Sequence, residues 1–262
     1  MRKVRTLIAA MFMLLCTTVS AQGIYNIGEV TLNDGDAYTA TEAAECEKVT
    51  YNRTFNNTNW QAWYVPFEID YDQLKNDFDV AEIINIHQAD NDDDGNMDET
   101  ELEVIKIKSG TLSANYPYLI RKKAKGAYSF VVENTVLEAA ANNAIDCSSV
   151  KIKYNFIGTS TGVSGNEMYN NGYYALSGGS LMKASGTGVS LKPLRWYMSV
   201  EARNGVRPAK TIKIRVAGET TDIENVVTND NSESVYYDLS GRRVENPTRG
   251  IYIKNGKKVI IK

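Results

Sequence analysis

Hydrophobic and polar residues alternate along most of the chain in short runs, and this period of two predicts β-strands. The clearest run covers 102–108, where apolar and charged residues alternate and β-branched residues are frequent. Similar runs, rich in Val, Ile, Tyr and Thr, lie between Gly, Asn and Asp turn residues at 49–51, 64–67, 118–120, 128–132, 151–157 and 211–216. Helix signals are few, with short turns expected at 72–78 and 139–144. We therefore expect an all-β fold whose main domain is a β-sandwich or jelly roll.

The alternating pattern changes character after Gly218. The stretch 219–234 is polar and lacks sustained apolar periodicity, so it reads as a linker. Two alternating segments then flank Asn255-Gly256, the residue pair that favours a type I′ hairpin. We expect a signal peptide at 1–21, a main domain at 22–218, a linker at 219–234 and a small C-terminal β module at 235–262.

The amino terminus has the three parts of a secretory signal peptide. Basic residues precede an apolar stretch at 7–16, and small residues end at Ala21, after which we expect cleavage. A lipoprotein anchored through Cys16 is the alternative, which Leu15 disfavours because the lipid-attachment pattern has a small residue there. The mature chain has no apolar stretch long enough to span a bilayer. We expect a secreted protein or one on the outer cell surface.

The most definite chemical motif is an acidic loop at 90–101. Calcium prefers about six to eight oxygen ligands, which alternate acidic residues can supply around one ion when a glycine makes the sharp turn. We expect four aspartate side chains, one backbone carbonyl and one glutamate as ligands. A strand after the loop would carry the carboxylate of this glutamate away from the ion. In order, the EF-hand positions one, three, five, six, seven, nine and twelve are occupied by Asp90, Asp92, Asp94, Gly95, Asn96, Asp98 and Glu101. The alternative is an acidic, solvated turn without an ion.

The segments that flank this loop predict strands, whereas a true EF-hand has helices on both sides. Apolar residues dominate 80–86, and 102–108 alternates. We therefore expect the loop to lie on a β-hairpin. It resembles the loops between strands of integrin-type propellers, and that resemblance implies a calcium ion that braces the scaffold and does no chemistry. A weak site of this kind suits an exported protein, because calcium is abundant outside cells.

Two cysteines, Cys46 and Cys147, remain after the expected cleavage. Export makes them candidates for one disulfide, because extracellular compartments are oxidising. The bond would close a loop of about 100 residues and would stabilise the fold by several kcal/mol on the chain-entropy model. The alternative is a pair of buried thiols.

Catalytic signatures are absent from the sequence, so we expect a protein that is not an enzyme. The single histidine, His87, has no second His or Cys at metal-ligand spacing and reads as a strand residue. Gly178-Gly179 reads as a hairpin turn, because no strand-to-helix transition follows it. A glycosidase needs only two carboxylates, so it remains the enzymatic alternative. The formal net charge of −3 and the lack of a basic stripe argue against nucleic acid as a partner.

Aromatic residues suggest a binding role, with a glycan or a cell-surface protein as partner. Neighbouring residues of a strand face opposite ways, so one ring of each adjacent pair would be exposed if one sheet face is solvated. The alternatives are that these rings form the core, and that the protein is a purely structural component of the cell surface. The ligand-binding candidates are Trp60, Trp63, Tyr173, Tyr174 and Trp196.

Two parts of the chain resemble known families. The tail carries an aspartate-leucine-x-glycine-arginine block at 238–242, a glycine-isoleucine-tyrosine block at 250–252 and a final lysine-valine strand. It resembles the C-terminal sorting domain of type IX secretion in Bacteroides-type bacteria, although it is shorter, and the resemblance implies the export machinery as a partner. The segments 51–67, 114–121 and 171–179 resemble a module of uncharacterised secreted proteins of gut Bacteroides-type anaerobes, often joined to leucine-rich-repeat surface antigens. This second resemblance covers roughly 24–216, implies a surface protein and carries no activity.

Overall fold

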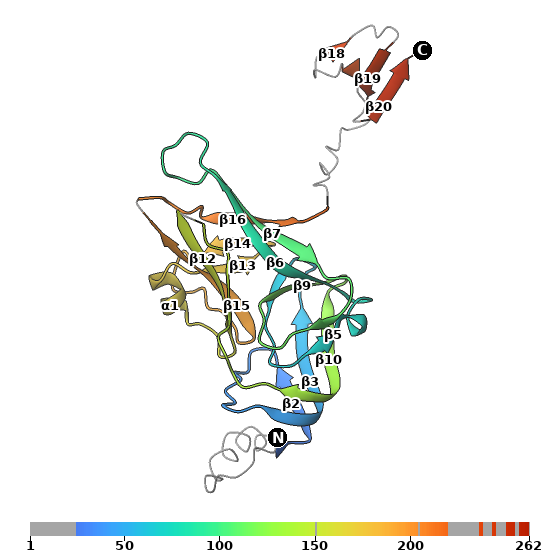
Figure 1. Ribbon diagram of the computed structural model, residues 1–262, viewed down its shortest axis with the longest axis vertical. Coiled ribbons are helices and arrows are strands. Elements are labelled where there is room, and N and C mark those ends of the chain that lie inside the picture. Colours follow the sequence, from blue (N-terminus) through green and yellow to red (C-terminus); the bar gives the residue numbers. More distant parts are fainter. Residues whose placement is uncertain are drawn as a thin grey trace. The chain divides into compact units, whose positions relative to one another are not determined.

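The computed structural model describes residues 25–149, 151–203, 205–219 and, near the C-terminus, 236–237, 243–244, 250–254 and 257–261 of the 262-residue chain. The chain divides into two compact units, Met1–Gly218 and Glu219–Lys262 (Figure 1). The expected signal peptide at 1–21 and all of the expected linker except Glu219 lie outside the described residues.

The first unit is built from strands, which confirms the expected all-β class. Its smaller sheet has the order β1-β3-β10, and β2 pairs with β3 on the same side as β1. Strands β3 and β10 are antiparallel, whereas β1 and β2 run parallel to β3. Two further strands, β5 (Ile69–Asp70) and β8 (Thr111–Leu112), form a pair of their own. The strands of the smaller sheet are β1 (Tyr25–Asn26), β2 (Glu29–Asn33), β3 (Ala44–Phe55) and β10 (Gly126–Leu137).

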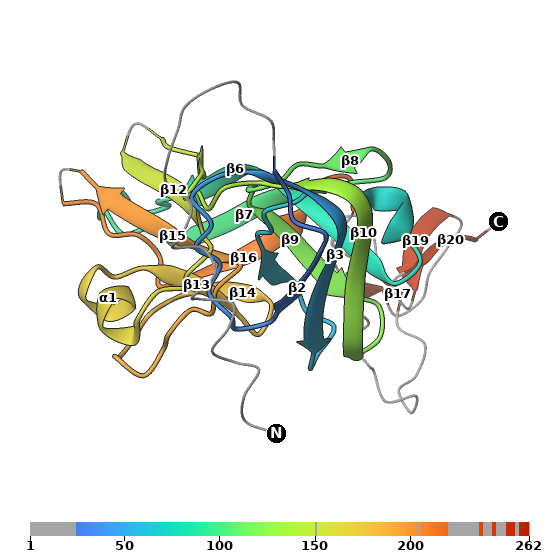
Figure 2. The ribbon, with the colours of Figure 1, turned by 90° about the horizontal axis from the view of Figure 1, so that it is seen from below.

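A ten-stranded sheet forms the rest of this unit. All its neighbours are antiparallel except β16 and β7, which are parallel. The sheet curls, as Figure 2 shows, and the indole Nε1 of Trp196 on β15 donates across the curl to the carbonyl oxygen of Tyr118 on β9 at 2.6 Å. In spatial order the strands are β11 (Ala144–Asp146), β12 (Ile152–Thr159), β15 (Arg195–Ala202), β13 (Tyr174–Ser177), β14 (Ser180–Lys183), β16 (Thr211–Val216), β7 (Glu99–Lys106), β6 (Phe78–Ala89), β9 (Tyr118–Lys122) and β4 (Gln61–Trp63).

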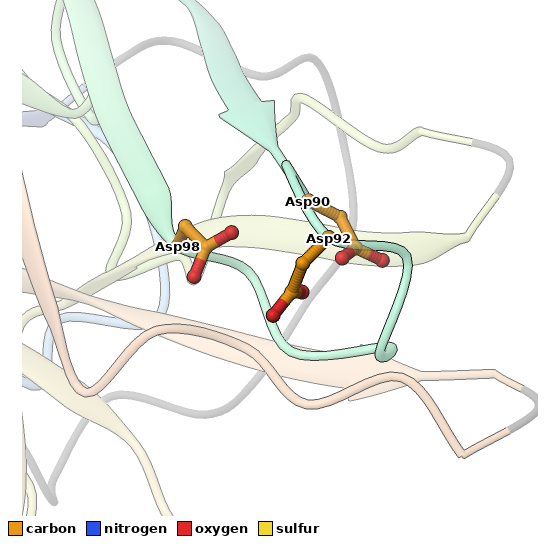
Figure 3. A group of neighbouring side chains, drawn as sticks. All are labelled: Asp90, Asp92 and Asp98. Carbon is orange, nitrogen blue, oxygen red and sulfur yellow. The ribbon is translucent and has the colours of Figure 1, made fainter.

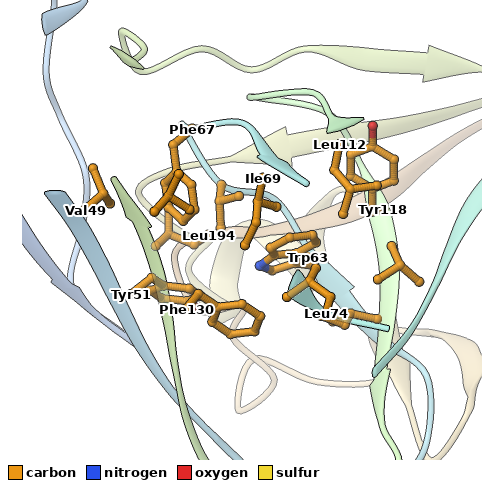
Figure 4. Packing of buried hydrophobic residues seen from close by; sticks show 14 of the residues in the cluster. Val49, Tyr51, Trp63, Phe67, Ile69, Leu74, Leu112, Tyr118, Phe130 and Leu194 are labelled. Carbon is orange, nitrogen blue, oxygen red and sulfur yellow. The ribbon is translucent and has the colours of Figure 1, made fainter. Parts of the chain in front are cut away.

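Three strands of the large sheet are buried on both faces: β4, β9 and the first half of β6, residues 78–83. In β9, Tyr118 and Ile120 point into one hydrophobic core, and Leu119 between them points into a second. The first core lies against β3 and β10 of the smaller sheet, as in the packing around Trp63 and Phe130 (Figure 4). The second core is enclosed by the curl of the large sheet. These three strands therefore form a wall that the two cores share. On the side of the first core, this wall and the smaller sheet pack as a sandwich.

Helical structure is sparse, as expected, but only partly where it was expected. The turn expected at 72–78 overlaps a short 3-10 helix, η1 (Tyr71–Gln73), whereas 139–144 has no helix and leads into β11. The α-helix α1 (Gly165–Asn170) was not predicted, because its six residues bury only Met168 and give no apolar stripe. Within the described part of the chain, no helix has the length and apolar character needed to cross a membrane.

The second unit contains a four-stranded sheet of order β18-β17-β19-β20. The last two strands pair antiparallel and end at the partners Lys254 and Lys257, the register of a two-residue hairpin loop. The expected turn residues 255–256 lie outside the described residues. The strands are β17 (Tyr236–Tyr237), β18 (Arg243–Val244), β19 (Gly250–Lys254) and β20 (Lys257–Ile261).

Candidate metal centre

The acidic loop joins β6 and β7, which pair antiparallel up to the partners Ala89 and Glu99. The expected β-hairpin is therefore confirmed. Within the loop, the side chains of Asp90, Asp92 and Asp98 lie close together, and one carboxylate oxygen from each lies within 4.8 Å of the others (Figure 3). Carboxylates gathered in one loop repel one another, and a cation among them would offset that repulsion, so the arrangement suits a cation.

Backbone amides of the loop bind the same carboxylates from outside. The amide of Asn91 donates to Oδ2 of Asp98 at 2.8 Å, and the amide of Gly95 donates to Oδ2 of Asp90 at 3.2 Å. The other oxygen of Asp90, Oδ1, is buried and has no hydrogen-bond partner. A buried carboxylate oxygen without a partner is costly, because it has lost its water and gained nothing in return. A bound cation would satisfy this oxygen.

A turn at Gly95 and a bridge to a second segment hold the loop in shape. Gly95 has φ +84°, a conformation that glycine adopts without strain. Its carbonyl accepts from the amide of Arg207 at 2.7 Å, and the amide of Met97 donates to the carbonyl of Arg207 at 3.1 Å. Asn96, between them, forms a parallel bridge with Arg207. The segment between β15 and β16 therefore braces the loop, a long-range contact that the loop's own sequence does not encode.

The same bridge orients the backbone of Asn96. In a parallel bridge, the central residue turns its own N–H and C=O away from its partner. The amide of Asn96 accordingly donates to Oδ1 of Asp94 at 2.7 Å, on the loop side. The bridge does not use the carbonyl of Asn96, which the sequence predicted as a backbone ligand.

Two of the six predicted ligands stand apart from the cluster. The carboxylate of Asp94 accepts from both the backbone and the side-chain amide of Asn96, and these bonds lower the pKa of Asp94. Glu101 lies on β7, with Oε2 at 3.8 Å from Nε of Arg215. The strand carries this glutamate away from the three clustered aspartates, as the sequence predicted for a glutamate on a strand.

His87 is a strand residue of β6, as expected. Its Nε2 lies 2.7 Å from Oε2 of Glu103, whose Oε1 accepts from Nη2 of Arg215 at 2.7 Å. The bond from His87 lowers the pKa of Glu103 below its ordinary value. This group of side chains is a surface ion-pair network beside the loop.

No family model, curated protein or solved structure matches this chain. The functional interpretation therefore depends on the geometry of the molecule itself.

Burial corrects the predicted aromatic platform. Trp63, Tyr174 and Trp196 have exposed fractions of 0%, 1% and 0%, so they are core residues and present no ring to a ligand. Trp60 is also buried and packs under the guanidinium of Arg121, whose Cζ is 4.7 Å from the ring centroid. Tyr173 alone of the five is half-buried, and its ring lies tilted against the ring of Tyr197, with 4.5 Å between the ring centroids. The prediction of exposed rings assumed that one face of the sheet is solvated. Strand β4, which carries Trp63, has no solvated face because a core lies on each side of it.

The expected disulfide is not formed. Cys46 and Cys147 are free, buried thiols. Cys46 belongs to the core between the two sheets, and Cys147 belongs to the core inside the curl, so they lie in separate cores. Burial, with the nearby charge of Asp146, raises the pKa of Cys147 to about 11. The structure therefore has the alternative, a pair of structural thiols.

One group of polar residues was missed at the level of sequence. Arg53 and Arg195 are almost fully buried and line a cavity beside β4. The sequence feature that could have revealed this group is Arg53, a charged residue at an inward-facing position of the alternating strand β3.

Proposed function

We propose that the loop at 90–98 binds one calcium ion that braces the β6–β7 hairpin. Asp90, Asp92 and Asp98 supply carboxylate oxygens, Asn96 supplies its backbone carbonyl, and water completes the coordination. The observation that carries this proposal is the buried Oδ1 of Asp90, which has no hydrogen-bond partner in the structure. An all-oxygen set of ligands matches a hard cation such as calcium and does not match zinc or copper, which favour nitrogen and sulfur.

We propose that the whole protein is a secreted or cell-surface module that binds a ligand and is not an enzyme. The signal-like amino terminus and the sorting-like tail support export, with the export machinery as a partner through the tail. A glycan or a cell-surface protein is the proposed ligand class. A cavity of about 340 Å³ lined mostly by polar residues supports binding over a purely structural role.

The walls of the described cavities bear on the glycosidase alternative. A glycosidase needs two carboxylates about 5–9.5 Å apart in a concave site. Neither of the two cavities described has an Asp or Glu among its lining residues. This composition supports binding in preference to hydrolysis.

Thermal unfolding of residues 22–262 tests the calcium site. We expect the melting temperature to rise in millimolar calcium relative to chelator, because an ion that binds only the folded state stabilises it by about 2.7 kcal/mol at a hundred times its Kd. Asp90→Asn should abolish the rise. Asp93→Asn is the matched control, since Asp93 lies in the same loop with φ +57°, is outside the aspartate cluster, and asparagine tolerates that backbone. Equal melting curves with and without calcium, or an equal loss in both variants, would contradict the proposal.

A further inference from the structure

A polar cavity of about 340 Å³ opens beside the edge strand β4. Its wall combines residues from β3, from β4 and the turn before it, from the β13–β14 hairpin, and from the segment that enters β15. The hairpin turns through Gly178 and Gly179, both at positive φ as in a type I′ turn, and the sequence predicted a hairpin turn at these glycines. Four segments far apart in sequence therefore converge on one hollow.

Arg53 is the most unusual residue in this wall. Its exposed fraction is 4%, and it points inward from β3 on the same face as Tyr51 and Phe55. Nη1 donates to the carbonyl of Ala62 at 3.1 Å and Nη2 donates to Oε1 of Gln61 at 2.7 Å, while Nε is buried without a partner. Among the described residues, no carboxylate forms an ion pair with Arg53, so its hydrogen bonds go to neutral oxygens.

A buried cation whose hydrogen bonds go only to neutral acceptors is unfavourable, and the charge of Asp34, which acts on Arg53 without pairing with it, offsets this cost only in part. Burial, followed by the charge of neighbouring Arg195, lowers the pKa of Arg53 to about 9, and the side chain is therefore still charged at neutral pH. The protein pays this cost at a cavity wall, where an anion could offset it.

Two further cations line the same cavity. Arg195 is 8% exposed, pairs with Asp34 and donates from Nη1 to the hydroxyl of Tyr51 at 3.1 Å. Lys192 places Nζ at 3.2 Å from the same aspartate. Asp34 pairs with Lys192 and Arg195 and also attracts Arg53 without pairing with it. The group of Arg53, Lys192, Arg195 and Asp34 still has a formal excess of two positive charges.

Backbone strain next to this group indicates that Arg195 is held in place. Leu194, the residue before it, has φ +58° and is buried against the core between the sheets (Figure 4). That conformation is unfavourable for a branched side chain and persists only where packing enforces it. The carbonyl of Leu194 accepts from Nη1 of Arg195 at 2.9 Å, so the strained turn fixes the guanidinium.

The remaining wall offers neutral hydrogen-bonding groups. Amides and hydroxyls bind the hydroxyl groups of sugars, and a cavity of this size accommodates one sugar ring. The polar wall residues are Asn57, Asn59, Gln61, Ser177 and Ser190.

We propose that this cavity binds a sugar residue that carries one anionic group, a carboxylate or a sulfate, with the anion facing Arg53 and Arg195. Guanidinium groups suit both anions, because their planar N–H pairs match the spacing of two oxygens. The proposal names the ligand class for the binding function proposed above and rests on it.

Calorimetric titration of residues 22–262 tests the cavity, with sodium glucuronate, glucose 6-sulfate, glucose and inorganic sulfate as probes. We expect at least one of the two anionic sugars to bind at least tenfold more tightly than both glucose and inorganic sulfate, and which of the two it is identifies the anion. Binding should weaken as salt is raised. Equal affinity for glucose, no binding of either anionic sugar, or sulfate alone binding as tightly would each overturn the proposal.

Variants locate the site. Arg53→Met removes the buried charge at similar volume and should abolish binding. Lys192→Gln, at an exposed residue that leaves the core untouched, should weaken binding at least threefold even if Arg53→Met does not fold. Lys75→Gln is the matched control, an exposed lysine that also pairs with an aspartate but lies outside the cavity wall. An equal effect of the Lys192 and Lys75 variants would overturn the location.

Calcium separates the two proposals. If chelator lowers the melting temperature but no anionic sugar binds, the calcium site stands and the cavity proposal alone fails. If anionic sugars bind and calcium has no effect on melting, the cavity stands and the metal proposal fails.

Discussion

Replacing Gly158 by alanine is the substitution for which the structure and local propensity make opposite predictions. In a strand, alanine is ordinarily favoured over glycine by about 0.5–1 kcal/mol. Gly158 lies on β12, and a Cβ built on its backbone would lie 1.9 Å from the ring of Tyr64. Real side chains do not approach so closely, so either the ring or the strand must move.

The cost follows from what Tyr64 does in the fold. Its ring is fully buried, its hydroxyl donates to the carbonyl of Ala141 at 2.7 Å, and it accepts from the amide of Asn143 at 3.1 Å. Moving the ring breaks both hydrogen bonds, at about 1 kcal/mol each. Overpacking adds about 1–3 kcal/mol. We expect Gly158→Ala to lower the free energy of unfolding by about 3–5 kcal/mol.

Urea unfolding followed by tryptophan fluorescence measures this loss. Gly186→Ala is the control, because a Cβ there would meet no atom within 4 Å and no positive φ is required. We expect the control to stay within about 0.5 kcal/mol of the parent protein. A Gly158→Ala variant less than about 1 kcal/mol from the parent would refute the packing of β12 against Tyr64.

Three further outcomes follow from the structure. Cys46 and Cys147 should both be alkylated in denaturant without reductant and neither in the folded protein at neutral pH, as mass spectrometry would show; an unlabelled denatured chain would mean that they are paired. Burial opposes ionisation of Asp34, but Arg195, Arg53 and Lys192 together outweigh it and hold the pKa of Asp34 below its ordinary value. The carboxylate's contribution to stability is therefore present above about pH 4 and lost as pH falls through its folded pKa. Asp34→Asn should therefore lower the urea midpoint at neutral pH and shrink the difference from the parent in acid, whereas a constant difference at every pH would contradict the ion pair. Trp196→Phe removes the 2.6 Å bond that crosses the curl and should cost about 1–3 kcal/mol in urea, and an unchanged midpoint would argue against that bond.

Local features of the fold were predictable from sequence. The hairpin around the acidic loop follows from the alternation on 102–108 and from the spacing of aspartates about Gly95, which are relations between near neighbours. The turn at Gly178 and Gly179 follows in the same way, because two residues at positive φ suit glycine. These elements bring together three of the predicted ligands, and the bridge to Arg207, which the loop's own sequence does not encode, holds the loop in shape.

Features that depend on the layers were not predictable in this way. Ala62 and Trp63 are both buried, one in each core, because β4 lies in a wall with a core on each side, and no local pattern says how many faces of a strand are covered. Cys46 and Cys147 fall in different cores for the same reason. Arg53 interrupts the apolar residues on the buried face of β3. The cavity that it lines, which accounts for this charged residue, is formed by segments far apart in sequence and is not visible from β3 alone.

Calcium titration of residues 22–262 by calorimetry tests the central claim most directly. We expect one calcium ion to bind per chain, binding to be lost in Asp90→Asn, and binding to be retained in Asp93→Asn. Absence of calcium binding to the folded protein, or equal binding by the Asp90 variant, would show that the clustered carboxylates of Asp90, Asp92 and Asp98 are not a calcium site.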